Sequence, residues 1–224
     1  MNISLNEAEC ALYEVYYKFL EEKNKVMNLT AISGIEDVYT LHFLDCIALT
    51  KFYSFFGKRV IDIGSGAGFP GMPLRLCTQN MSLTVLDAQQ KRILFLRELS
   101  QRLSLQDVVC LHARAEEAAG KADMREQFDC AVSRAVARLP VLCELCMPFV
   151  RIGGKFIAMK SVDTQAEIND AENAIALLGG KIESVSDYTV PCTNVVHRAI
   201  IIEKTAKTPS EFPRRFAKIQ KTPL

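Results

Sequence analysis

Apolar side chains at helical spacing dominate the first quarter of the chain. Over residues 6–24 they recur at three- and four-residue intervals with Glu and Lys between them, which predicts an amphipathic helix. Residues 35–54 show a looser version of the same pattern and predict a second helix, which ends at Gly57. We therefore expect residues 1–57 to form a helical extension that packs on the remainder of the protein.

The hydrophobic pattern changes at about residue 58, where short apolar runs begin to alternate with longer helical patterns. The runs predict strands at 59–63, 83–87, 108–112, 128–132 and 155–159, the last after a turn at Gly153-Gly154. Helices are predicted at 71–79, 89–103, 137–149 and 164–178. Such alternation, with mostly apolar strands, is typical of a parallel sheet covered on both faces.

Two further strands, at about 182–190 and 196–203, follow without a helix between them. Strands joined by a short connection pair antiparallel, so one antiparallel strand should lie near an edge of the sheet. The expected fold is therefore α/β, with a doubly wound, mostly parallel sheet of seven strands over residues 58–204 and a tail at 205–224.

Composition narrows the class of protein further. Of the 224 residues, 49% are hydrophobic and 24% are charged, as in ordinary globular proteins, which argues against disorder and coiled coil. No apolar run approaches the ~18 residues that span a membrane, and the N-terminus lacks a charged segment followed by an apolar one. We therefore expect a cytoplasmic protein with no membrane partner.

Charge is distributed unevenly, although the net charge is only +1. From Lys204 to the end the chain has six basic residues and one acidic residue, so this tail carries +5 and the remainder −4. A basic terminal segment can contact phosphate groups or can be a solvated end. Charge alone leaves both interpretations open.

The eight cysteines and three histidines do not predict a metal site. Cys143 and Cys146 have CxxC spacing, but no second ligand pair accompanies them, and most of the cysteines lie in apolar stretches typical of buried residues. His42 and Asp45 lie one helical turn apart, which is more typical of a satisfied buried pair than of a catalytic dyad.

A glycine-rich loop follows the first strand and opens a helix, the position at which a doubly wound fold binds a nucleotide. From Gly64 the pattern is GxGxG (Gly64, Gly66, Gly68), which resembles motif I of S-adenosylmethionine-dependent methyltransferases. A GxGxxG dinucleotide fingerprint can be read only from Gly66, although its first glycine should directly follow the strand. The interpretation as an NAD-dependent oxidoreductase therefore fails on register.

Charged residues end the neighbouring strands. Asp87, after the second strand, can accept hydrogen bonds from ribose hydroxyls or can cap the next helix. Asp62, just before the loop, can order the loop and the amino group of a ligand. Ala115 and Glu116 follow the third strand, where the methyltransferase fold flanks an adenine. Arg134, after the fourth strand, can hold a carboxylate or a phosphate, or can be a surface arginine.

Together these segments resemble one family, the bacterial small-subunit rRNA guanine-N7 methyltransferases (RsmG, formerly glucose-inhibited division protein B). The resemblance runs from about residue 24 to the end, and Cys46 departs from it where a serine is expected. It rests on residues 42–46, 62–74, 91–92, 133–135 and 213–215.

The resemblance implies a methyltransferase that uses S-adenosyl-L-methionine to methylate N7 of a guanosine in 16S rRNA, the position usually numbered 527 in the 530 loop. It implies cofactor contacts at Gly64, Phe69, Ala115, Glu116 and Arg134. Guanine N7 has a free lone pair, so its methylation needs alignment rather than a catalytic base, and no catalytic residue is expected.

The candidate site residues combine the motif and the resemblance. Cofactor contacts are expected at Gly64, Gly66, Gly68, Phe69, Asp87, Ala115, Glu116 and Arg134. Arg214 and Arg215 are expected to bring the tail back over the cofactor cleft and to contact phosphates of 16S rRNA in the small ribosomal subunit. A monomer is expected, without a metal. A small-molecule methyltransferase and a non-catalytic interaction protein are the alternatives.

Overall fold

The computed structural model describes residues 5–134 and 137–224. Its strands are β1 (Arg59–Ile63), β2 (Ser82–Asp87), β3 (Val108–His112), β4 (Phe128–Arg134), β5 (Val150–Ser161), β6 (Gly180–Thr189) and β7 (Val196–Lys204). They form one sheet of seven strands in the order β3-β2-β1-β4-β5-β7-β6. β1 to β5 are parallel to one another, and β7 is antiparallel to both β5 and β6. The predicted fold class is thus confirmed, including the antiparallel strand near one edge.

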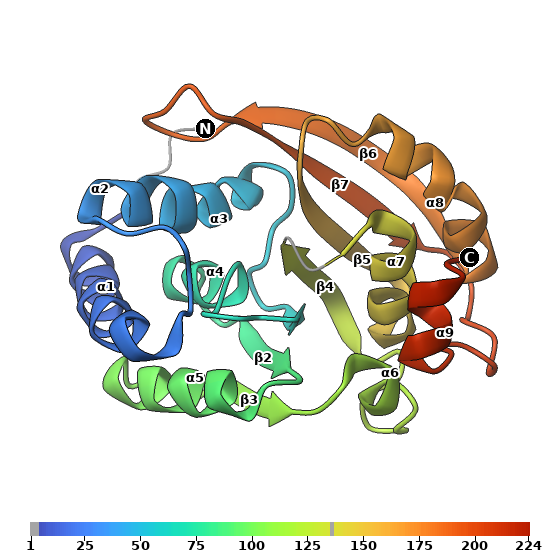
Figure 1. Ribbon diagram of the computed structural model, residues 1–224, viewed down its shortest axis with the longest axis horizontal. Coiled ribbons are helices and arrows are strands. Elements are labelled where there is room, and N and C mark those ends of the chain that lie inside the picture. Colours follow the sequence, from blue (N-terminus) through green and yellow to red (C-terminus); the bar gives the residue numbers. More distant parts are fainter. Residues whose placement is uncertain (1–4, 135–136) are drawn as a thin grey trace.

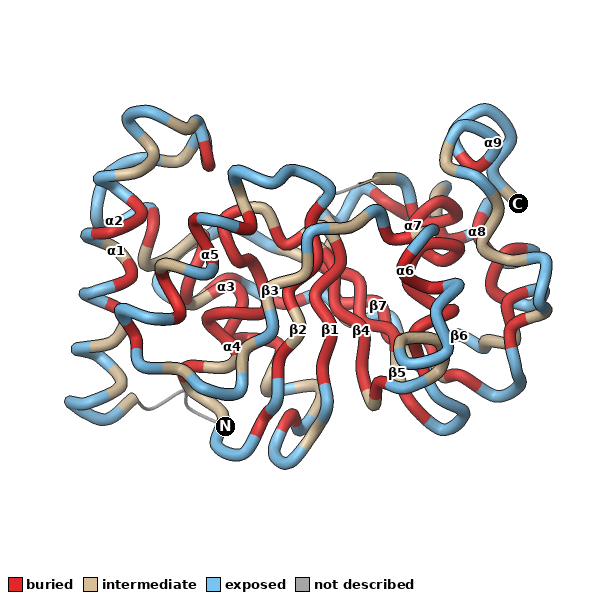
Figure 2. The backbone as a smooth tube through the Cα atoms, turned by 90° about the horizontal axis from the view of Figure 1, so that it is seen from below, coloured by how far each residue is buried: buried red, intermediate tan, exposed pale blue. Residues whose placement is uncertain are grey.

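Helices cover both faces of this sheet. They are α1 (Glu7–Met27), α2 (Ile35–Val38), α3 (Asp45–Ile47), α4 (Gly71–Cys77), α5 (Gln90–Arg102), α6 (Ala115–Ala118), α7 (Leu139–Cys146), α8 (Gln165–Leu177) and α9 (Phe216–Lys221). Figure 1 shows α1 to α5 gathered on one side of the molecule and α6 to α9 on the other. Between the two groups, the strands form the buried centre seen in Figure 2.

Two hydrophobic cores lie on the two faces of the sheet, because successive strand residues point in opposite directions. In β1, Val60 belongs to the core that contains Tyr16 and Phe19 of α1, whereas the next residue, Ile61, belongs to the core that contains Leu142 of α7. Aromatic rings of the N-terminal helices are therefore part of the main core on one face.

Residues 35–51 are less regular than the sequence pattern predicts. A π-helix (Tyr39–Leu44) follows α2, and a 3₁₀ helix (Ala48–Lys51) follows α3. Single π turns within helices are common at functional sites. This one carries His42, which lies in the functional site described below.

The predicted turn at Gly153-Gly154 is wrong, because both glycines lie inside β5. The register between β4 and β5 shifts there, with Val150 opposite Phe128 and Lys155 opposite Cys130. A side chain at Gly154 would lie 2.7 Å from the carbonyl oxygen of Asp129. These glycines permit an irregularity between two closely spaced strands rather than a reversal of the chain.

The basic tail folds back onto α7 rather than extending into solvent. The Arg214 guanidinium forms a bidentate ion pair with the carboxylate of Glu144, which is fully buried. The Nη2–Oε2 and Nε–Oε1 distances are 2.6 and 2.8 Å. Ile219 of α9 is buried in the same core. The expectation that Arg214 offers its guanidinium fork to phosphate therefore needs correction, since the Nε and Nη2 edge of that group already binds Glu144. Arg215 remains exposed.

We predict that Arg214→Ala destabilises the protein by about 3–5 kcal/mol, because it leaves the buried Glu144 carboxylate without its partner. Arg215→Ala removes the neighbouring charge from an exposed site, and the matched change should stay within about 0.5 kcal/mol. Urea unfolding of both variants measures the difference. Equal stabilities would contradict the structural role assigned to Arg214.

Candidate functional site

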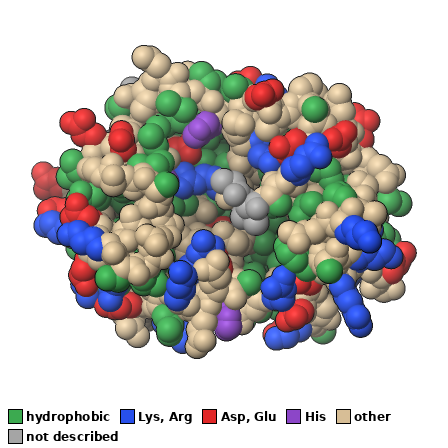
Figure 3. All heavy atoms as spheres, in the orientation of Figure 1, with side chains coloured by type: hydrophobic (Ala, Val, Ile, Leu, Met, Phe, Trp, Pro, Cys, Tyr) green, Lys and Arg blue, Asp and Glu red, His purple; other side chains and the backbone are tan. Residues whose placement is uncertain are grey.

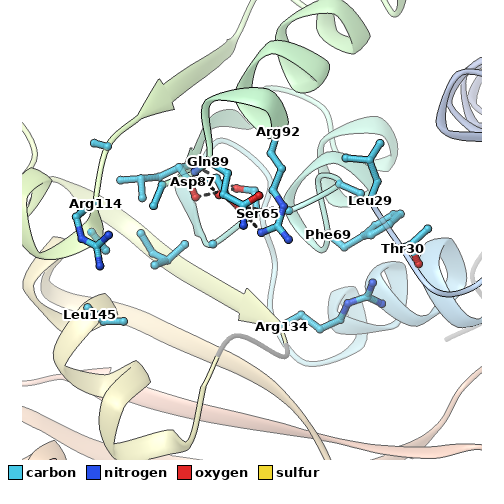
Figure 4. A pocket seen from close by; sticks show the side chains of 18 of the residues that line it. Leu29, Thr30, Ser65, Phe69, Asp87, Gln89, Arg92, Arg114, Arg134 and Leu145 are labelled. Atoms are coloured by element: carbon cyan, nitrogen blue, oxygen red, sulfur yellow. Dashed lines mark hydrogen bonds and ion pairs between the residues drawn. The ribbon is translucent and has the colours of Figure 1, made fainter. Parts of the chain in front are cut away.

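A cavity of about 520 Å³ opens at the carboxyl edge of the sheet, where β1, β2, β3 and β4 end. Figure 4 shows Asp87 and Ser65 near its middle, Arg114 and Leu145 at one end, and Leu29, Thr30 and Phe69 at the other. The residues of the predicted set that line it are Gly64, Gly66, Phe69, Asp87, Ala115, Glu116 and Arg134. Ligands of doubly wound sheets bind at this edge.

The first part of the glycine loop presents backbone to the cavity. Gly64 and Gly66 have φ values of +72° and +58°, in the left-handed region that favours glycine. The Gly64 N–H donates to the carbonyl oxygen of Leu86 at 2.8 Å, which fixes the start of the loop against β2. A Cβ at Gly66 would have the Gly64 oxygen as its nearest neighbour, at 3.9 Å. The missing side chain leaves room for a ligand to approach the backbone.

Gly68 has a different role from the one predicted for it. Gly68 is absent from the described residues that line the cavity. Its φ is +103°, and a Cβ there would lie 2.6 Å from the Tyr16 hydroxyl oxygen and 2.9 Å from a methyl carbon of Leu96. This glycine is therefore required for packing of the loop against α1 and α5.

Asp87 ties the loop to β2 and α5. Its Oδ2 accepts hydrogen bonds from the Gly66 N–H at 3.0 Å and from Arg92 at 3.2 Å, and its Oδ1 accepts from the Gln89 N–H at 2.8 Å. The two sequence interpretations of Asp87 are thus compatible. The carboxylate orders the chain just before α5, and the same residue lines the cavity.

Asp62 stabilises the glycine-rich loop through a backbone hydrogen bond. Its side chain is completely buried, and Oδ2 accepts the Gly71 N–H at 2.8 Å. Burial raises the pKa of this carboxyl to about 7, against the opposing effect of the Gly71 hydrogen bond. Because Asp62 is not among the described cavity-lining residues, the structure supports its role in ordering the loop but not contact with a ligand.

The end of β3 meets the tail at one end of the cavity. Glu116 accepts a hydrogen bond from Arg114 at 2.7 Å, and the Arg114 guanidinium lies 4.8 Å from the centre of the Phe216 ring. Phe216 itself lines the cavity. The tail therefore returns to the cleft, as expected, through an aromatic residue that the charge pattern did not single out.

Arg134 is held by the N-terminal helices. Its guanidinium donates to the Leu41 carbonyl oxygen at 3.1 Å, to Asp45 Oδ2 at 3.2 Å and to His42 Nδ1 at 2.8 Å. It also lies 4.8 Å from the centre of the Phe69 ring. The terminal nitrogens are thus engaged within the protein, which differs from the expectation that they hold a ligand carboxylate or phosphate.

His42 stays neutral in this arrangement. Burial, together with the adjacent Arg134, lowers its pKa to about 3. Since Nδ1 accepts from Arg134, Nε2 carries the proton and donates to the Thr30 hydroxyl at 2.8 Å. His42 and Asp45 are therefore a satisfied buried pair, as predicted, although Arg134 connects them.

In the part of the chain that the structure describes, no group of three or more His, Cys, Asp and Glu side chains is arranged to hold a metal ion. Over the same residues, no helix is both long and apolar enough to cross a membrane. The free cysteines of the CxxC pair, Cys143 and Cys146, are buried in α7.

Solved structures share this doubly wound fold. The protein is similar to a SAM dependent methyltransferase from Aquifex aeolicus, with a TM-score of 0.58 and 16% identity over 75% of this chain and 93% of that one. It is also similar to a ribosomal protein L11 methylase from Lactobacillus delbrueckii subsp. bulgaricus, with a TM-score of 0.55 and 14% identity over 72% and 77% of the two chains.

Sequence comparison gives the family. The family described as rRNA small subunit methyltransferase G matches residues 9–196. Relatives named ribosomal RNA small subunit methyltransferase G from Clostridium tetani and Lachnoclostridium phytofermentans are 42% and 43% identical over all of this chain and 94% and 93% of their own lengths. The chain belongs to the rRNA small subunit methyltransferase G family.

We predict that Gly68→Ala costs about 2–5 kcal/mol of stability, because it combines strain at a positive φ with overlap against Tyr16 and Leu96. Gly66→Ala has the same strain of a positive φ, but its Cβ would have no close neighbour. It should therefore lower the stability by only ~1 kcal/mol. Thermal or urea unfolding compares the two variants. A Gly68→Ala protein as stable as the Gly66→Ala protein would refute the distinction between these glycines.

Proposed function

We propose that this protein transfers a methyl group from S-adenosylmethionine to N7 of a guanosine in 16S rRNA, at the position usually numbered 527. The observation that carries the proposal is membership of the rRNA small subunit methyltransferase G family over residues 9–196. The cavity at the carboxyl edge of the sheet supports it, because its volume of about 520 Å³ suits a cofactor-sized ligand.

The residues around the cavity fit S-adenosylmethionine. The backbone of Gly64 and Gly66 is open to close approach, and Asp87 offers carboxylate oxygens to ribose hydroxyls. Ala115 and Glu116 would flank the adenine, and Phe69 with Arg134 would form the wall near the reacting group. The bound cofactor supplies an electrophilic methyl group on a positively charged sulfur.

N7 methylation suits a site of this kind. Guanine N7 reacts through its own lone pair, so the protein needs to align the base and exclude competing geometries rather than remove a proton. The titratable groups nearest the wall are already engaged, since Arg134 pairs with Asp45 and His42 is neutral. The enzyme therefore would act by positioning, with no catalytic base.

Basic side chains near the cavity would contact the RNA. Arg215 lines a groove of about 480 Å³ with Arg114 and Phe216, which also line the first cavity. Glu116 and Glu117 line the same groove. Figure 3 shows Lys and Arg side chains near the middle of the face that the cavity opens on. We infer that Arg215, rather than Arg214, is the tail residue available to phosphate. The partner is the small ribosomal subunit or its 16S rRNA, and the protein would act in the cytoplasm as a monomer.

The direct test is transfer of tritiated methyl groups to small subunits and to free 16S rRNA from a strain that lacks this gene. We expect label in 16S rRNA, recovered as 7-methylguanosine. Gly66→Val is the control, because its side chain would fill the space at the loop backbone and abolish cofactor binding. Label in a small molecule but not in rRNA would favour the alternative methyltransferase, and no transfer to any acceptor would refute the enzymatic proposal.

A salt series tests the tail. Arg215→Ala should weaken binding of 16S rRNA and reduce the log–log slope of affinity against salt by about 0.7–0.9, since one phosphate contact is lost with its released counterions. The matched control is Lys181→Ala, an exposed lysine on β6 at the amino edge of the sheet. Binding curves for Arg215→Ala that superimpose on those of the wild type would show that the tail is a solvated end.

A further inference from the structure

A second cavity, of about 530 Å³, lies beside the first. His42 and Arg134 line both cavities, so the two cavities adjoin along these side chains. The second cavity extends from these side chains over the ends of β4 and β5 and the start of β7, where Met159, Lys160 and His197 line it. It therefore continues the carboxyl edge of the sheet on the far side of Arg134 from the glycine loop.

The far side of this cavity contains an ion pair between β5 and α8. Lys160 Nζ lies 2.6 Å from Glu167 Oε2, and both side chains are largely removed from solvent, at 10% and 22% exposed. Lys160 also donates to the carbonyl oxygen of Ala137 at 2.8 Å. Glu167 Oε2 additionally accepts the Leu139 N–H at 2.9 Å. These contacts hold the carboxylate in one place.

The second carboxylate oxygen of Glu167 is not used in the same way. Among the described residues, the hydrogen bonds and the ion pair of Glu167 all fall on Oε2. Within residues 5–134 and 137–224, Oε1 therefore keeps its lone pairs available on a residue that lines the cavity. The remaining walls include apolar side chains, Ile32 and Leu41 among them, which suit the faces of an aromatic ring.

Guanine matches this distribution of groups. Its N7 and O6 are acceptors on one edge, whereas N1–H and the exocyclic N2 amino group are donors on another. If N7 faces the first cavity where the two cavities adjoin, the donor edge of guanine points away from the first cavity, toward the side where Glu167 lies. The two lone pairs of Oε1 can accept from both donors of guanine, but adenine presents no donor at N1.

We propose that the second cavity binds the target guanine, extruded from the RNA, and that Glu167 recognises its N1–H and N2 amino groups while Lys160 holds the carboxylate in position. This inference rests on the proposed function and names the residues that select the base. Extrusion of a base into a pocket is the usual way for an enzyme to reach it. Glu167 is a specificity residue here and takes no part in methyl transfer itself.

The test uses a 16S rRNA fragment whose methylated guanosine has been mapped with the wild-type enzyme. Replacing that guanosine by inosine removes only the N2 amino group and leaves N7, O6 and N1–H in place. We expect kcat/KM of the wild-type enzyme to fall about 10- to 100-fold on the inosine fragment, the usual worth of a well-placed base contact. This measurement does not depend on the folding of any variant.

The second part of the test measures the Glu167→Gln variant on the guanosine and the inosine fragments. The kcat/KM of this variant on the guanosine fragment should fall by a similar factor. Replacing guanosine by inosine should then lower the kcat/KM of the variant only slightly further. The Kd of the variant for S-adenosylmethionine should stay unchanged. Glu172→Gln, an exposed acid on the same helix, is the matched control and should behave as the wild type.

The outcomes separate the two proposals. Wild-type rates that are equal on guanosine and inosine, or full activity of Glu167→Gln, would overturn the role of Glu167 and leave the proposed function standing. Failure of the wild-type enzyme to methylate any rRNA would remove the proposed function, and this inference would fall with it.

Discussion

The ion pair between Arg134 and Asp45 is the contact on which the arrangement of this protein depends. Asp45 is completely buried, and its carboxylate also accepts hydrogen bonds from Tyr188 and His197 at 2.8 and 2.9 Å. It therefore joins the N-terminal helices to the end of β4 and to the β6–β7 pair, segments far apart in sequence. Loss of one partner of a buried ion pair costs several kcal/mol of stability, so this contact strongly favours one position of the N-terminal helices on the sheet.

The same contact orders the site. Because α3 positions Asp45 and the preceding π turn positions His42, Arg134 is directed onto the ring of Phe69, which also stacks against His42 with 4.3 Å between ring centres. Other contacts hold the rest of the loop, with Asp62 on Gly71 and the Tyr16 hydroxyl 2.5 Å from the carbonyl oxygen of Ala67. A loop held from several elements keeps its shape before a ligand arrives, which is the requirement for a site that acts by alignment.

The sheet and its carboxyl-edge cleft could be predicted because both rest on local patterns, namely apolar runs and a glycine loop after the first strand. What could not be predicted depends on partners distant in sequence. Gly66 and Gly68 look alike in the motif, and only the position of α1 shows that one faces a cavity and the other faces Tyr16. Charge likewise predicted a basic tail, but the partner of Arg214 is a single acid, Glu144, within the apolar helix α7. A lone acid in such a helix was the available signal.

The side chains at which the two cavities adjoin also resolve an electrostatic difficulty in the proposed chemistry. The sulfur of S-adenosylmethionine is positively charged, and methylation at N7 moves that charge onto the base. An unpaired guanidinium at this position would repel the cofactor and the methylated base alike. Asp45 neutralises Arg134 at 3.2 Å, and His42 adds no charge because its pKa is lowered to about 3. The Arg134–Asp45 pair, which holds the N-terminal helices on the sheet, therefore also makes this part of the site compatible with a positive charge on the cofactor or on the methylated base.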